Sequence, residues 1–348
     1  MRSSARLPAA TIARLRRALR RWYLRERRPL PWRKNHDSYR VWVAEVMLQQ
    51  TRIAVVIPAY ARFLKAFPTL RRLAAAEEDD VLSLWSGLGY YSRARSLHRA
   101  AQMLRAAGAA EFPLEYDEAR KLPGVGSYTA AAVLSIAYDR PYAAVDGNVV
   151  RVLSRLFCLQ RPGSKGEPHV ALAQTLLDPK RPGDWNQAMM ELGETVCTPA
   201  APRCHVCPWG SACEARLRSA IDRHPPPKQR RSRERLELDL YLLRDRDRRL
   251  LLERGSFAHL PHLWLPPLRI VDRGEYRKQR PLATFHHAIL HRDFNIAVYQ
   301  RVLSDSTVKR MLRRRDGIER EMFSTNELTG IGRSSLLSKA LALTTVPS

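Results

Sequence analysis

Four of the five cysteines lie close together, in the pattern C-x6-C-x2-C-x5-C formed by Cys197, Cys204, Cys207 and Cys213. Thiolates this close in sequence can converge on one metal centre, whereas the cysteines of a disulfide-stapled secreted domain are expected to spread along the chain. Zinc sites usually combine two C-x2-C pairs, and only Cys204 and Cys207 form such a pair here. We therefore predict a [4Fe-4S] cluster, with a structural zinc site and unrelated thiols as the alternatives.

The chain is long and strongly basic. Its 348 residues exceed one typical core, so two or three domains are expected. Lys and Arg number 60 against 34 Asp and Glu, which gives a formal charge of +26. This excess predicts a polyanionic partner, with nucleic acid as the first candidate. The alternative is a basic surface that serves solubility.

The N-terminal segment is rich in arginine. Ile12, Leu15, Leu19 and Trp22 fall at helical spacing, which predicts an amphipathic helix with an arginine face rather than an organellar transit peptide. No apolar run is long enough to span a membrane, and no signal-peptide core is visible. We expect no membrane association and a cytoplasmic, reducing environment.

The residue pattern changes once along the chain. From Tyr39 to about Ala220, dense helix-spaced apolar residues predict an all-helical region. The Pro- and Arg-rich stretch 223–235 is typical of a linker. Beyond it, alternating residues 236–242 and the apolar run 250–252 predict a β-hairpin. A second strand pair is expected at 284–291 and 294–303, turning at Arg292-Asp293, and a closing helix at 334–343.

The segment LPGVG at 122–126 separates a polar helix end from an apolar helix that begins at Tyr128. Gly124 and Gly126 allow a tight turn and a close approach of the backbone to a ligand. Amides at such a helix N-terminus bind phosphate, so this segment predicts a helix-hairpin-helix that grips the DNA backbone. A plain helix connection is the alternative.

Two carboxylates stand out. Glu45 lies in the apolar run 41–48, where burial would raise its pKa and suit it to act as a general acid. Asp146 lies in the turn VDGN before a predicted helix. Two such carboxylates around a glycosidic bond would supply an acid and a stabiliser of a cationic sugar. The alternatives are an arginine partner for Glu45 and a helix N-cap for Asp146.

Six ordered motifs resemble one known family. They are WVAEVMLQQT at 42–51, LWSGLGYYSRAR at 84–95, LPGVG at 122–126, VDGN at 145–148, NQAMMELG at 186–193 and the four cysteines. Together they look like adenine DNA glycosylases (A/G-specific, MutY type) of the endonuclease III and helix-hairpin-helix superfamily. The resemblance runs nearly continuously from about Trp22 to Cys213.

The resemblance implies an enzyme of base excision repair that flips out and removes adenine mispaired with 8-oxoguanine or guanine in double-stranded DNA. It implies a helical region at 1–222, composed of a six-helix barrel (about 29–137) and an iron-sulfur cluster domain (1–28 with 138–222). It further implies one [4Fe-4S] cluster per chain, a monomer, and a cytoplasmic, nucleoid-associated location.

The resemblance also implies roles for individual residues. Glu45 matches the general acid that protonates adenine at N7, and Asp146 matches the carboxylate that stabilises the oxocarbenium-like sugar. Tyr128 and Asn148 match the residues that position these groups and the water. The implied contacts are Trp32, Arg33, Leu48 and Gln187 in the adenine pocket, Gln50 and Tyr90 in the base stack, Thr51 and Leu88 near the opposite base, and Gly124, Gly126 and Arg203 on phosphates.

Position 128 separates this family from its relatives that excise oxidised pyrimidines and cut the strand. Those enzymes carry a lysine after the hairpin glycines, whose amine forms a Schiff base. Tyr128 therefore predicts a monofunctional glycosylase that leaves an abasic site. The two competing hypotheses are a base-excision lyase and a non-catalytic DNA-binding protein that uses neither Glu45 nor Asp146.

Residues 236–348 match the family less well. The resemblance implies a smaller α+β, Nudix-like domain that recognises the 8-oxoguanine strand and lacks the hydrolase box. The family's turn Gly-Leu-Trp-Gly-Gly-Leu is replaced by Ala258 to Leu263, and its loop His-x-Phe-Ser-His reads His287-Ala288-Ile289-Leu290-His291. In the family, the Phe-Ser pair supplies a wedge and a hydroxyl that probe the damaged guanine. Because this chain lacks the pair, the sequence predicts adenine removal more strongly than it predicts a preference for 8-oxoguanine.

Overall fold

The chain divides into two compact units. The computed structural model describes residues 7–159, 167–226, 233–272, 279–289, 292–314, 316–331 and 334–344. Unit 1 comprises Met1–Ala75 and Ser96–Gln229, and unit 2 comprises Ala76–Arg95 and Arg230–Ser348. The finer bounds expected from the sequence for a barrel and a cluster domain stay predictions.

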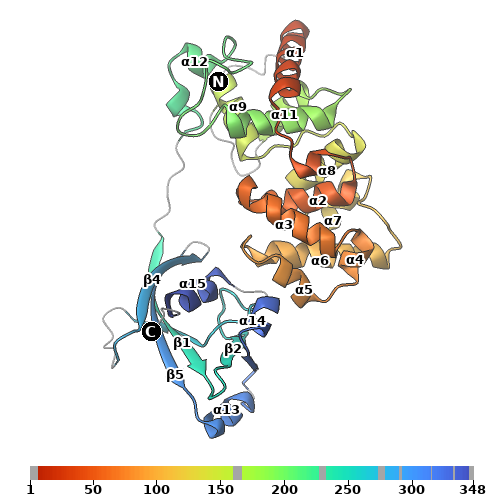
Figure 1. Cartoon of the computed structure of the whole chain (residues 1–348). Helices are drawn as coiled ribbons and strands as arrows, with labels where there is room; N and C mark the ends of the chain where they lie inside the picture. Colours follow the sequence, from red (N-terminus) through yellow and green to blue (C-terminus); the bar gives the residue numbers. More distant parts are fainter. Residues whose placement is uncertain are drawn as a thin grey trace. The chain divides into compact units, whose positions relative to one another are not determined.

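Unit 1 is helical, as the apolar spacing predicts (Figure 1). Its elements are α1 (Ala9–Glu26), η1 (Pro31–Arg33), α2 (Ser38–Leu48), α3 (Ile53–Ala66), α4 (Leu70–Ala74), α7 (Tyr116–Lys121), α8 (Ser127–Tyr138), α9 (Gly147–Leu156), α10 (Glu167–Leu176), α11 (Pro182–Thr195), α12 (Glu214–Leu217) and η2 (Ile221–Arg223). Helix α6 (Tyr91–Ala106) crosses the boundary between the units.

Helix α8 is the buried centre of unit 1. All its residues from Thr129 to Ile136 are buried, as expected for a helix that is apolar all round. It packs against α2, which carries Glu45, and against α7 and α11, and α11 in turn packs against α9, which Asp146 caps.

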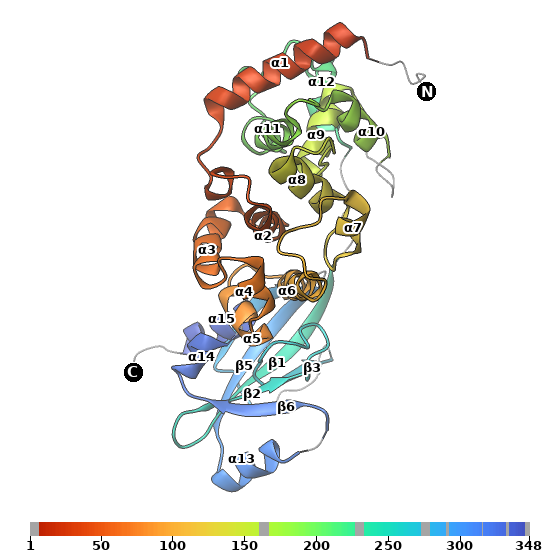
Figure 2. The ribbon, with the colours of Figure 1, turned by 90° about the vertical axis from the view of Figure 1, so that its right-hand side faces the viewer.

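Helix α1 confirms the amphipathic N-terminal segment. Its apolar stripe, including Leu15, Leu19 and Trp22, is buried, and the helix packs along α11 and α10 (Figure 2). The indole Nε1 of Trp209 donates to the carbonyl of Leu15 at 3.0 Å, which ties the cysteine loop to this helix.

The predicted helical hairpin is present in unit 1. Helix α7 ends at Lys121, and α8 begins directly after Gly126. Gly124 has φ +75°, a left-handed conformation, and a Cβ built there would lie 2.7 Å from the Cβ of Ser96. Gly124 is therefore required both by its backbone conformation and by the close approach of α6.

Unit 2 is a mixed sheet with short helices, and it also contains α5 (Glu78–Leu84). Its strands and helices are β1 (Glu234–Arg244), β2 (Leu250–Arg254), β3 (Leu268–Val271), β4 (Ala283–Ile289), β5 (Arg292–Val302), α13 (Asp305–Leu312), β6 (Glu319–Phe323), α14 (Glu327–Gly330) and α15 (Ser335–Thr344). The strand order is β4-β5-β1-β2-β6, and β3 pairs with β1.

Strand β1 is central because it has partners along both edges. It pairs in parallel with β5 over its whole length, from Glu234 opposite Arg292 to Arg244 opposite Val302. The expected hairpin with β2 is confirmed by the antiparallel pair Arg244 and Leu250. Helix α15, which confirms the predicted closing helix, packs beside β4.

The predicted turn at Arg292-Asp293 is wrong. These residues open strand β5, where Arg292 faces Ile289 and Asp293 faces Ala288 of β4. Both are also paired to β1, so the ladder with β1 extends the strand through residues that are typical of a turn. The central part of the expected linker, 227–232, and the recognition-loop residues Leu290 and His291 lie outside the described residues.

Within the described part of the chain, no helix is both long and apolar enough to cross a membrane.

Candidate active site

One cavity in unit 1 collects most of the residues that the sequence singled out. Its volume is about 590 Å³. The four expected catalytic residues line it, together with the four expected adenine contacts, one base-stack residue and one residue expected near the opposite base, namely Glu45, Asp146, Tyr128, Asn148, Trp32, Arg33, Leu48, Gln187, Gln50 and Thr51. Residues from η1, α2, α8, α9 and α11 thus meet at one place, although they are far apart in sequence.

Glu45 is buried in the cavity wall, with 5% of its surface exposed. The hydroxyl of Tyr128 donates to its Oε2 at 2.6 Å. Burial raises the pKa of Glu45 to about 7, while the Tyr128 hydrogen bond and the charge of Arg33 act in the opposite direction. The carboxyl can therefore hold a proton near neutral pH, as a general acid requires.

Asp146 is the N-cap of α9, which confirms the helix-capping role that the sequence offered as an alternative. Its Oδ1 accepts from the backbone N–H of Val149 at 2.8 Å, and its Oδ2 accepts from Nδ2 of Asn148 at 2.8 Å. Burial raises the pKa of Asp146, and these hydrogen bonds oppose the rise. Capping fixes the Asp146 carboxylate at the cavity wall, so the same side chain can cap the helix and also act on a ligand in the cavity.

Asn148 joins the site to the cysteine loop. Its Oδ1 accepts from Nη2 of Arg151 at 2.7 Å, and Arg151 Nε donates to the carbonyl of Cys197 at 2.7 Å. Helix α11 approaches closely here, because a Cβ on Gly193 would lie 2.6 Å from the Cβ of Asn148.

The turn that leads to Asp146 is held by Asn186, a residue for which the sequence predicted no individual role. Asn186 is buried, accepts from the backbone N–H of Ala144 at 3.1 Å, and donates to Ser135 Oγ and to the carbonyl of Tyr142, each at 2.8 Å. The signal available in the sequence was a polar residue inside the quoted string NQAMMELG. Nothing in that string shows which loop the amide reaches.

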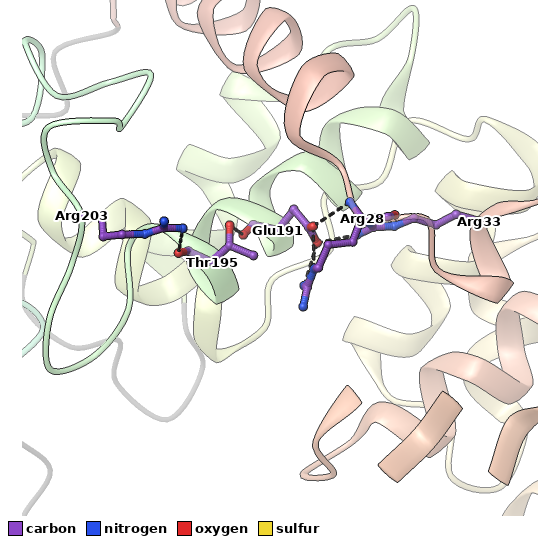
Figure 3. A network of polar contacts seen from close by, with 5 residues as sticks. All are labelled: Arg28, Arg33, Glu191, Thr195 and Arg203. Atoms are coloured by element: carbon purple, nitrogen blue, oxygen red, sulfur yellow. Dashed lines mark hydrogen bonds and ion pairs between the residues drawn. The ribbon is translucent and has the colours of Figure 1, made fainter. Parts of the chain in front are cut away.

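Glu191 and Arg28 were also missed. They line the same cavity, and Glu191 accepts hydrogen bonds from both Arg28 and Arg33 (Figure 3). Glu191 belongs to the same string as Gln187, one helical turn further along α11. Arg28 lies in an arginine-rich segment, where one arginine cannot be distinguished from its neighbours by sequence.

The remaining expected contacts lie outside the cavity. Leu88 and Tyr90 belong to unit 2, where Leu88 is buried and Tyr90 is exposed beneath the guanidinium of Arg93. Gly124 and Gly126 form the helical hairpin. Arg203 is exposed, and its Nη2 donates to the carbonyl of Thr195 at the end of α11 at 2.8 Å.

The four cysteines share one loop between α11 and α12, and all are unpaired and half-buried. In the described ranges, no three His, Cys, Asp or Glu side chains lie close enough together to hold a metal ion. Burial, and after it the neighbouring thiols, raises the pKa of Cys207 to about 12. Arg155 donates to Cys197 Sγ at 3.5 Å, so positive charge lies beside this sulfur. Four thiols in one loop are the donor set that binds a [4Fe-4S] cluster, and the guanidinium beside Cys197 fits its thiolate form.

Comparison with protein families and curated proteins relates this site to DNA repair. Residues 43–172 match the HhH-GPD superfamily of base excision DNA repair proteins. Adenine DNA glycosylase of Rattus norvegicus is 48% identical over 221 residues, which cover 60% of this chain and 43% of that protein. The Schizosaccharomyces pombe adenine DNA glycosylase is 45% identical over 227 residues, covering 59% of this chain and 49% of that protein. The chain thus spans less than half the length of these two relatives.

Solved structures show the same helical fold. A thermostable thymine-DNA glycosylase superposes with a TM-score of 0.54 at 25% identity, covering 60% of this chain and 99% of that chain. A trapped endonuclease III–DNA covalent intermediate superposes with a TM-score of 0.52 at 24% identity, covering 60% of this chain and 98% of that chain. Residues 43–172 thus match the HhH-GPD superfamily of base excision DNA repair proteins, and these two likenesses show that the chain shares the helical fold of the solved structures.

Proposed function

We propose that this chain is a monofunctional adenine DNA glycosylase, which hydrolyses the N-glycosidic bond of adenine mispaired with 8-oxoguanine or guanine in double-stranded DNA. The observation that carries the proposal is the meeting of Glu45, Tyr128 and Asp146 around one cavity. The relatives named adenine DNA glycosylases support the choice of base. The chain is expected to act as a monomer on nucleoid DNA in the cytoplasm.

Glu45 is the proposed general acid. Its raised pKa, about 7, keeps a proton on the carboxyl at neutral pH, and the Tyr128 hydroxyl fixes its orientation. Protonation of a flipped adenine at N7 would make the base a better leaving group. Arg33 lines the same cavity, and its charge opposes the rise in the pKa of Glu45.

Asp146 is proposed to stabilise the sugar cation that develops as the bond breaks. Its carboxylate is held by the N–H of Val149 and the amide of Asn148, so it needs no reorganisation during the reaction. One carboxyl that carries a proton and another that carries a charge is the arrangement used in glycoside hydrolysis.

The monofunctional outcome is supported by the cavity wall. A lyase needs an amine to form a Schiff base with the sugar. Tyr128 occupies the position after the hairpin glycines, and the described residues that line the cavity include no lysine. An abasic site is therefore the proposed product.

Cys197, Cys204, Cys207 and Cys213 are proposed to hold one [4Fe-4S] cluster, whose contribution is to fold and fix the loop that carries Arg203. Anaerobically purified protein should contain about four irons and four sulfides per chain. Stoichiometric zinc in place of iron would contradict this assignment.

Unit 2 is proposed to contact the strand that carries 8-oxoguanine, as a Nudix-like domain. Ile289, at the position of the family's phenylalanine, is buried in the core of unit 2 and cannot act as a wedge in DNA. We therefore expect a smaller difference between A opposite 8-oxoguanine and A opposite G than a wedge would give.

The test is single-turnover adenine release from duplexes that hold A opposite 8-oxoguanine, G or T, with Glu45→Gln in parallel. The proposal expects release at the two mispairs, strand breaks only after alkali, and no release by the variant, which still binds the duplex. Breaks without alkali would favour a lyase instead. No release from any duplex by cluster-loaded protein would leave a DNA-binding protein without this chemistry.

A further inference from the structure

Glu191 is a buried carboxylate with two arginine partners. Only 1% of its side chain is exposed. Its Oε1 accepts from the backbone N–H of Arg28 at 3.1 Å and from Arg28 Nε at 2.7 Å, and its Oε2 accepts from Arg28 Nη2 at 2.8 Å. Oε2 also accepts from Arg33 Nη2 at 2.9 Å (Figure 3).

These contacts fix the guanidinium of Arg33. Its Nη1 donates to the carbonyl of Arg28 at 3.1 Å, so Arg33 is held on one side by Glu191 and on another by a backbone that Glu191 also binds. The guanidinium further lies 5.6 Å from the centre of the Tyr23 ring. Its Nε is left as the buried donor without a partner in the described residues.

Glu191 stays charged. Burial disfavours the ionised form, but the hydrogen bonds from Arg28 and Arg33 outweigh burial and lower the pKa of Glu191. The carboxylate thus compensates the guanidinium charges beside a reaction centre that itself develops positive charge.

We propose that Glu191 is a positioning residue of the glycosylase, which fixes Arg33 in the cavity wall and balances its charge beside Glu45. This inference rests on the proposed function and extends it to a residue that acts through Arg33.

The groups around Glu45 determine how loss of the Glu191 charge would change the pKa of Glu45. Tyr128 on α8, Asp146 at the start of α9 and Arg33 on η1 act on it electrostatically. Helix α3 also packs on α2 and brings the buried Tyr60, whose hydroxyl bonds the carbonyl of Arg40. Without Glu191, the charge of Arg33 would be uncompensated, so Glu45 would lose its proton at lower pH and the sugar cation would be disfavoured.

The experiment compares Glu191→Gln with Glu191→Asp by single-turnover adenine release across pH. Glu191→Gln removes the charge, and we expect the rate near neutral pH to fall about tenfold or more, with the alkaline loss of activity moved to lower pH. Glu191→Asp keeps the charge but shortens the reach, so its rate should fall with the pH midpoint unmoved. Glu26→Gln, which removes an exposed glutamate paired with Arg25, is the matched control and should leave both unchanged.

If Glu191→Gln lowers the rate by the same factor at every pH, Glu191 has only a structural role and the proposal is overturned. A pH profile of adenine release that matches the wild type would overturn it as well. If Glu191→Gln does not fold, the double variant Glu191→Gln with Arg28→Gln restores the net charge. The pH midpoint of the double variant should then lie near that of the wild type. If this midpoint instead lies at clearly lower pH, as expected for the loss of the Glu191 charge alone, the proposal is overturned.

A second readout separates this inference from the proposed function. Isotope-edited infrared titration of the glutamate carboxyls, referenced to Glu45→Gln, follows the Glu45 proton without any substrate. If wild-type protein releases no adenine, the proposed function fails, yet a lower titration midpoint for Glu45 in Glu191→Gln would still support the electrostatic role. An unmoved midpoint would overturn it.

Discussion

The Tyr128 hydroxyl donates a 2.6 Å hydrogen bond to Oε2 of Glu45 and lies 3.1 Å from the sulfur of Met190. Because a hydrogen bond to a carboxylate favours its charged form, Tyr128 lowers the pKa of Glu45, while burial raises it. With the charges of Asp146, which raises the pKa, and Arg33, which lowers it, these effects give a pKa of about 7. The proposed acid is therefore poised by a neighbour on α8, and not by burial alone.

Tyr128→Phe should move the pH profile of adenine release. Loss of the hydroxyl removes an interaction that favours the carboxylate, so the pKa of Glu45 rises and activity persists to higher pH. The maximal rate should fall several-fold, because the carboxyl also loses the group that orients it. Single-turnover rates from about pH 5.5 to 9 would check this. An alkaline limb that moves to lower pH would contradict the assigned direction.

Glu45→Gln should stabilise the protein at alkaline pH. In the unfolded chain this carboxyl ionises near its ordinary pKa of 4.5, whereas in the folded chain it stays protonated until about pH 7. Ionisation between these values favours the unfolded state, so stability is lost as pH rises through this window. With about 1.4 kcal/mol per pKa unit, the variant should gain at most about 3 to 4 kcal/mol above pH 7.

Urea unfolding of wild type and Glu45→Gln at several pH values would measure this gain. The difference in free energy of unfolding should be small near pH 5 and should grow toward about pH 8. A difference that shrinks as pH rises would show that the folded protein favours the charged form of Glu45.

Glu45 was predictable because its signal is local. A carboxylate in the apolar run 41–48 is expected to be buried, and α2 buries it. The turn VDGN predicted two roles for Asp146, a helix N-cap and a catalytic carboxylate. In the structure, Asp146 caps α9 and also lines the cavity. The hairpin around Gly124 was predictable for the same reason.

Glu191 was not predictable, because its signal is long-range. Its partner Arg28 lies 163 residues away, and Arg33 lies 158 residues away. The basic composition offers many equivalent arginines, and only the folded chain brings these two, from the segment after α1, to Glu191 on α11. The turn misplaced at Arg292 has a similar cause, since pairing with β1 overrides the local preference of Arg292 and Asp293.

Gly193→Ala should damage the site through Asn148. An added methyl would lie 2.6 Å from the Asn148 Cβ and 3.1 Å from its Cα, so α9 and α11 must separate. Overpacking of this kind costs about 1 to 3 kcal/mol of stability. Displacement of Asn148 would also loosen its bonds to Asp146 and Arg151.

Thermal unfolding and single-turnover release, both measured on Gly193→Ala, would check this effect. Gly330→Ala is a control in the other unit, because a Cβ there meets nothing within 4 Å. Adenine release should fall about tenfold or more at temperatures where the variant remains folded. Full activity with lowered stability would show that Asn148 tolerates the displacement.

The two hairpin glycines give a matched pair in which only one has a structural reason to be glycine. Gly124→Ala places a Cβ 2.7 Å from Ser96 Cβ on a residue with φ +75°, so it should cost about 1 to 3 kcal/mol of stability and distort the turn. Gly126 has an extended backbone, and a Cβ there meets nothing within 4 Å. Gly126→Ala should therefore change the free energy of unfolding by less than about 0.5 kcal/mol.

DNA affinity, measured on the same two variants, separates a change in the structure of the turn from a loss of its contact with DNA. If the amides of this hairpin bind phosphate, Gly124→Ala should weaken binding to matched duplex and flatten its dependence on salt, because fewer counterions are released. Gly126→Ala keeps the turn and the N–H groups, so any loss of affinity in this variant reports the steric approach of the DNA backbone to residue 126. Equal losses of stability in the two variants would contradict the geometry at Ser96, and unchanged affinity in both would remove the hairpin from the DNA interface.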